Sequence, residues 1–80
     1  MKALFNCNII KNVYLRDNNN IFVELEITYL DNATRPWVSR RDIDKLSQTN
    51  MEYQIERYTK AFEKLKQALL NKESFVEIEL

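Results

Sequence analysis

The side chains that could perform catalysis are few, because the 80-residue chain contains one cysteine and no histidine. Histidine is the commonest general base and metal ligand in proteins, so any nucleophile here would have to pair with a lysine or a carboxylate. The cysteine, Cys7, falls on the apolar side of an alternating segment, where buried thiols are usually inert packing residues. Glycine is also absent from the sequence, which excludes every glycine-rich phosphate loop. We therefore predict that the protein is not an enzyme, has no catalytic residues and uses no cofactor.

Two pairs of glutamates have a spacing that could hold a cation. Glu24 and Glu26, like Glu77 and Glu79, are two residues apart, so each pair projects from one face of a strand. Neighbouring strands could combine the pairs into an oxygen-ligand site. A solvated sheet face is the simpler interpretation, and we predict no metal site.

The segment TRPWVSRRD, residues 34–42, holds the only proline, the only tryptophan and three of the twelve basic residues. Pro36 cannot donate to a strand ladder, so a strand here must be short and lie at a sheet edge. Ser39 and Asp42 have the spacing of a helix start. Arginine beside tryptophan suits protein-binding hot spots and nucleic-acid backbones alike. The predicted partner-binding residues are Arg35, Trp37, Arg40, Arg41 and Lys45. The alternative is that these arginines pair with neighbouring acids on a solvated helix start.

Apolar residues alternate with polar ones in two segments near the N-terminus, which predicts two strands. The first covers residues 3–15, with its odd-numbered side chains toward the core. Lys11 breaks the alternation, which predicts either a bulge there or an edge strand that carries an inward charge. The second covers residues 21–29, and the four residues 17–20 would close an antiparallel hairpin. Residues 31–33 are predicted to form a further turn.

The second half of the chain has helical periodicity before a last strand. Residues 40–47 predict a short helix, residues 50–70 a long amphipathic helix ending near Asn71, and residues 75–80 a strand. The apolar stripe of the long helix comprises Met51, Ile55, Tyr58, Phe62, Leu65 and Leu69. The order β-β-(short β)-α-α-β predicts an α+β fold in one compact domain over residues 1–80. We expect a small antiparallel sheet of three to four strands, with the long helix packed on one face.

Several apolar residues are predicted to lie on the sheet face opposite the core. They are Leu4, Ile10, Tyr14, Phe22, Leu30 and Phe75. Either the short helix or another protein chain would cover them. Phe22, Leu30 and Phe75 therefore form a second candidate binding surface.

Charge and composition narrow the functional class. The twelve basic and twelve acidic residues balance, so no overall field draws the chain to nucleic acid or membrane. The N-terminal apolar run is interrupted by polar residues and the lone cysteine cannot form an internal disulfide, which predicts a cytoplasmic protein. Nine asparagines among many lysines and isoleucines suggest an AT-rich genome, such as that of a phage or other mobile element.

These observations favour a small non-enzymatic protein-binding module, an inhibitor or adaptor that acts on a host protein or complex. The alternative is a small nucleic-acid-binding protein that uses the helical pair of residues 40–70. The partner is then predicted to be another protein rather than nucleic acid or a membrane, with a homodimer left open.

Overall fold

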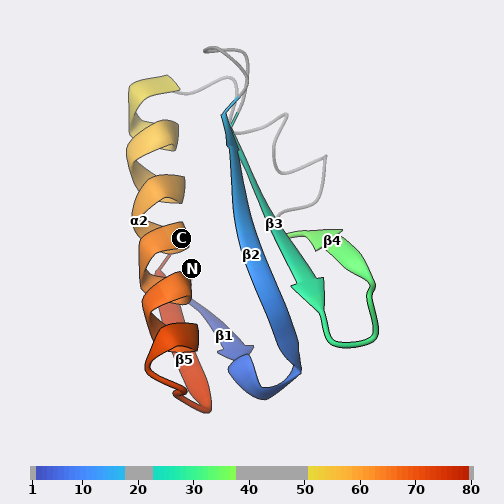
Figure 1. Cartoon of the computed structure of the whole chain (residues 1–80). Coiled ribbons are helices and arrows are strands. Elements are labelled where there is room, and N and C mark those ends of the chain that lie inside the picture. Colours follow the sequence, from blue (N-terminus) through green and yellow to red (C-terminus); the bar gives the residue numbers. More distant parts are fainter. Residues whose placement is uncertain (1, 18–22, 38–50, 80) are drawn as a thin grey trace.

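The computed structural model describes residues 2–17, 23–37 and 51–79 of the chain (Figure 1). Within these stretches it contains strands, one short 3-10 turn (η1) and one long helix. In chain order they are β1 (Lys2–Asn6), η1 (Cys7–Ile9), β2 (Ile10–Asp17), β3 (Val23–Tyr29), β4 (Thr34–Pro36), α2 (Met51–Leu70) and β5 (Phe75–Glu79).

The strands form two antiparallel sheets rather than one. The first is three-stranded, in the order β2-β3-β4, and the second is a two-stranded ribbon of β1 and β5. Helix α2 contacts β2, β3 and β5. Figure 1 shows it running along β2, with the ribbon beside its C-terminal half. The predicted α+β fold, with antiparallel strands and a helix packed against them, is confirmed.

The single strand predicted over residues 3–15 is wrong, because η1 divides it into β1 and β2. The Asn6 side chain accepts a hydrogen bond from the Asn8 amide at 3.0 Å, which caps this turn. Three residues of tight turn shift the alternation by one position, so Cys7 and Ile10 are both buried while Ile9 is exposed. Ile10, predicted to face outward, therefore belongs to the core.

The bulge predicted at Lys11 is confirmed. The β2–β3 register shifts there, since Ile10 is opposite Tyr29 and Asn12 is opposite Thr28. This extra residue reverses the alternation a second time. From Val13 onward the odd-numbered side chains again face the core.

The predicted long helix is confirmed as α2, but its apolar stripe is centred differently. The fully enclosed positions are Tyr58, Ala61, Leu65 and Ala68, whereas Phe62 is only partly buried. Small alanine side chains let the helix backbone approach the strands closely. The strand residues that complete the core are Ile10, Val13, Val23, Leu25, Ile27, Val76 and Ile78.

The helix ends with the cap that the sequence predicts at Asn71. The next residue, Lys72, has a left-handed backbone (φ 55°), and the amide of Glu73 donates to the Ala68 carbonyl at 3.0 Å. The backbone amide of Lys72 also donates to the Leu69 carbonyl at 3.2 Å, which completes a Schellman motif. In a chain without glycine, lysine occupies the position where glycine is usual.

The predicted turn over residues 31–33 joins β3 to β4. Asp31 Oδ1 accepts the Ala33 amide at 3.0 Å, and Asn32 adopts the left-handed conformation that asparagine tolerates. Within the described stretches, strand β4 is short and lies at the edge of its sheet, as Pro36 requires. The hairpin loop after Asp17 and the helix predicted over residues 40–47 lie outside the described residues. No helix in the described stretches combines the length and hydrophobicity needed to cross a membrane.

Candidate functional site

Trp37, the centre of the predicted binding segment, packs at the border of the core. It is half-buried, and its backbone amide donates to the Leu25 carbonyl at 2.8 Å. Its ring centroid lies 5.5 Å from that of Phe5 on β1 and 5.9 Å, edge-on, from that of Tyr58 on α2. Trp37 thus joins the ribbon, the helix and the three-stranded sheet.

Arg35, two residues earlier, is exposed. Its guanidinium carbon lies 5.8 Å from the centre of the Tyr29 ring, within the range of a cation–π contact. Arg35 is opposite Ile27 in the β3–β4 register, so it projects from the same sheet face as the core residues. Among the described residues it has no acidic partner within ion-pair distance. The other predicted basic residues, Arg40, Arg41 and Lys45, lie outside the described stretches.

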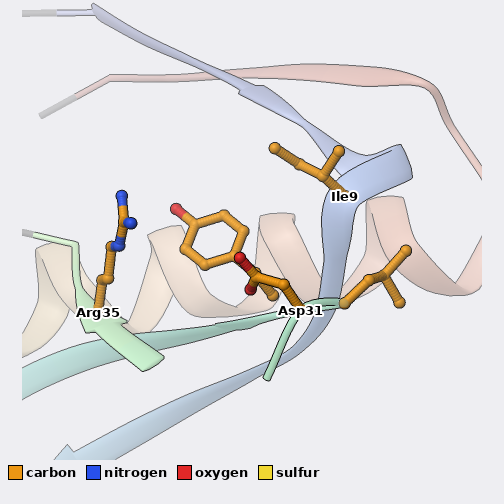
Figure 2. A pocket seen from close by; sticks show the side chains of 5 residues that line it. Ile9, Asp31 and Arg35 are labelled. Carbon is orange, nitrogen blue, oxygen red and sulfur yellow. The ribbon is translucent and has the colours of Figure 1, made fainter. Parts of the chain in front are cut away.

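Arg35 borders an open hollow of about 450 Å³, which we call the Arg35 hollow. Its lining residues are Ile9, Tyr29, Leu30, Asp31 and Arg35 (Figure 2). The Leu30 amide donates to the Ile9 carbonyl at 3.0 Å, which fixes η1 beside the β3–β4 turn. Leu30 is 62% exposed and Ile9 50%, so two large apolar side chains stand uncovered next to a cation.

Three of the described residues carry the charges at or beside the hollow. Among the described lining residues, Asp31 carries the one carboxylate, and one of its oxygens accepts the Ala33 amide. Lys11 reaches the same turn, where its ammonium donates to Asn32 Oδ1 at 3.2 Å. With Arg35, two cations stand against one anion among the described residues, so this part of the hollow suits an apolar group that carries negative charge.

Sequence reasoning identified Arg35 and Leu30 but assigned them to different surfaces. It missed Ile9, which was predicted to be buried, because alternation was followed through a tight turn. The signal for the turn was Asn6 with Asn8, since an asparagine accepting an amide two residues ahead is a turn-forming pattern.

The predicted outward apolar face is divided between the two sheets. Leu4 and Phe75 lie on the outer face of the ribbon and are diagonal neighbours, because Leu4 is opposite Glu77 and Asn6 is opposite Phe75. Leu30 instead lines the Arg35 hollow. Phe22 lies outside the described residues.

The two glutamate pairs are not brought together. Glu24 and Glu26 belong to β3, while Glu77 and Glu79 belong to β5 in the other sheet. Glu26 Oε2 instead lies 3.1 Å from the Nε atom of Arg16. Within the described stretches, no cluster of three or more potential metal ligands occurs.

Cys7 is buried in η1 between the two sheets. Burial raises the pKa of its thiol above the usual value, and the negative charge of Glu73 adds to this effect. A raised pKa lowers the fraction of reactive thiolate at neutral pH. Burial and the raised pKa together make Cys7 a packing residue rather than a reactive thiol.

The chain matches no known protein family, and neither a curated protein nor a solved structure matches it.

Proposed function

We propose that the chain is a small, non-enzymatic protein-binding module whose contact surface is the Arg35 hollow. The observation that carries this proposal is the exposed Leu30 beside an arginine that has no acidic partner in the described part of the chain. In the cell it would act as an inhibitor or adaptor of a host protein, encoded by a phage or other mobile element and located in the cytoplasm.

Arg35 supplies the polar part of recognition. The Tyr29 ring beneath it restricts the side chain, so less freedom is lost when a partner binds. The planar guanidinium presents paired donors that match a carboxylate. The proposed partner segment therefore carries a carboxylate, from an acidic side chain or a chain terminus.

The apolar lining of the hollow supplies the apolar part of recognition. Covering Ile9 and Leu30 would remove apolar surface from water, at about 25 cal/mol for each Å². A hollow of about 450 Å³ lies within the size range of sites that take small groups. The proposed partner segment therefore places an apolar side chain next to its carboxylate.

The test is affinity purification of the tagged chain from its native host, with the co-purified proteins quantified by mass spectrometry. We expect Arg35→Gln and Leu30→Asp each to weaken capture of the main partner by about tenfold or more. Arg35→Lys keeps the charge but not the planar fork, and we expect an intermediate loss.

The matched control is Leu70→Asp, since Leu70 is 69% exposed at the end of α2 and does not line the hollow. It should leave capture unchanged. Equal recovery of the partner with Leu30→Asp and with wild type would contradict the proposal.

Nucleic-acid binding is the competing function. The exposed side of α2 carries Lys60, Lys64 and Lys66, which favours it, but Lys60 lies 2.9 Å from Glu56 in an ion pair. The opposite side of the helix is already buried in the core. We expect affinity for DNA or RNA weaker than about micromolar at physiological salt, measured by fluorescence anisotropy. Tighter binding with a steep salt dependence would favour this second function.

A further inference from the structure

We infer that the free edge of β1 binds the same edge of a second copy of the chain. The two β1 strands would pair antiparallel about Leu4 and join the two ribbons into one four-stranded sheet. None of the described residues that line the Arg35 hollow belongs to β1.

The hydrogen bonds of the ribbon show which β1 groups are available. The Cys7 amide donates to the Ser74 carbonyl at 2.9 Å, directly after the last β1–β5 pair. In an antiparallel ladder the groups that point toward the partner strand alternate, so Phe5 and Ala3 also point toward β5. The residues whose backbone groups point to the outer edge are Lys2, Leu4 and Asn6. Within the described stretches, no strand pairs with this edge.

The other strand edges carry features that oppose pairing. On β4, the Trp37–Leu25 hydrogen bond places the backbone of Pro36 on the outer side, where proline offers no amide. On β2, the Val13 amide is occupied at 2.8 Å by the side chain of Asn12. On β5, the alternating residues Glu77 and Glu79 would place like charges against a second copy. Charges, prolines and occupied amides are common protections of sheet edges.

The edge of β1 has no such protection at its centre, Leu4. Symmetric pairing there places Leu4 opposite Leu4 and Lys2 opposite Asn6, so no like charges meet. The outward amides and carbonyls then fall at the hydrogen-bonded positions of the new ladder. A two-fold contact of this kind is self-complementary, which is why the occupant we infer is a second copy.

The apolar side chains on the outer face support the same occupant. Leu4 is 71% exposed and its diagonal neighbour Phe75 is 58% exposed. Pairing would bring the Leu4 side chains of both copies together, flanked by Phe75 of each. Five-residue strands make a small contact, so we expect a weak dimer, with a dissociation constant of about micromolar or higher.

The first experiment is analytical ultracentrifugation of the full chain over about micromolar to millimolar concentration. We expect a concentration-dependent monomer–dimer equilibrium. Leu4→Lys places like charges directly opposite each other and should raise the dissociation constant at least tenfold. Leu70→Lys is the control, because Leu70 is 69% exposed and lies off the β1 edge, and it should leave the constant unchanged. Circular dichroism checks that both variants fold.

The second experiment avoids the charge that Leu4→Lys adds to β1. In a Cys7→Ser background, Leu4→Cys would place two thiols across the two-fold axis on Cα atoms about 5.5 Å apart, within disulfide reach. Mild oxidation should give a covalent dimer much faster than in the matched Leu70→Cys variant. A chain that stays monomeric throughout, or equal rates for the two cysteine variants, would overturn the inference.

Discussion

The two sheets of this molecule are built from similar alternating strands but differ in their outer faces. The outer face of the three-stranded sheet is mostly polar. Arg16 and Glu26 pair there at 3.1 Å, and the hydroxyl of the half-exposed Tyr14 accepts a hydrogen bond from the Asn12 side chain at 3.1 Å. The outer face of the ribbon carries exposed Leu4 and Phe75, and its ion pair, Lys2 with Glu77, is long at 3.9 Å. A two-stranded ribbon is only marginally stable alone, so it depends on α2 and on the Phe5–Trp37 contact. The outer face of the larger sheet therefore pairs its own polar groups, whereas the outer face of the ribbon leaves apolar area that a further contact would cover.

The largest expected effect tests the helix on which both sheets depend. Leu65 is fully buried in α2, so Leu65→Ala should lower the free energy of unfolding by about 3–5 kcal/mol. Phe62→Ala should lower the free energy of unfolding by less, because Phe62 is only partly buried despite its larger side chain. Chemical denaturation measures both. A larger loss for Phe62→Ala would restore the stripe predicted from periodicity alone.

A second pair of variants compares the sheets directly. Ile27 on β3 and Ile78 on β5 are almost equally buried, so their truncation to alanine removes the same atoms from similar exposure. We expect the free energy of unfolding to fall by about 4 kcal/mol for Ile27→Ala and by about 2 kcal/mol for Ile78→Ala, since β3 has a strand on both sides. Chemical denaturation midpoints measure the two losses, and amide hydrogen exchange shows whether either sheet opens locally. Equal losses would show that the ribbon is as integral to the core as the larger sheet.

The smallest effect concerns Cys7, where the two sheets join. Its pKa is raised in the folded chain by burial and then by Glu73. The thiol therefore stays protonated in the folded state at a pH where the unfolded chain has lost that proton. Its contribution to the free energy of unfolding is fully present below the unfolded pKa and is lost as pH rises through the folded pKa.

Denaturation of wild type and Cys7→Ala across the alkaline range isolates this contribution, because other groups titrate equally in both. Labelling of native Cys7 by a thiol reagent should be slow at neutral pH and fast after unfolding. Fast native labelling would place the thiol at the surface and contradict the junction described here.

The sequence by itself determined much of the local structure of this protein. Alternation and helical spacing predicted the class, the bulge at Lys11 and the helix over residues 50–70. The chemistry of single residues predicted the edge position at Pro36 and the helix cap at Asn71. These features are local, because each depends on residues within a few positions of one another.

Tertiary structure decided the rest. The turn at Cys7–Ile9 splits one predicted strand into two sheets and exchanges the places of Ile9 and Ile10. A one-residue change of register moves the following side chains to the other face. Alternation showed the change at Lys11, where a charge breaks the pattern, but not the one at Cys7–Ile9, where an apolar residue stands at each odd position. The Arg35 hollow exists because the Leu30–Ile9 hydrogen bond joins segments twenty-one residues apart. Sequence supplied the apolar and basic residues, and only the folded chain placed them beside one another.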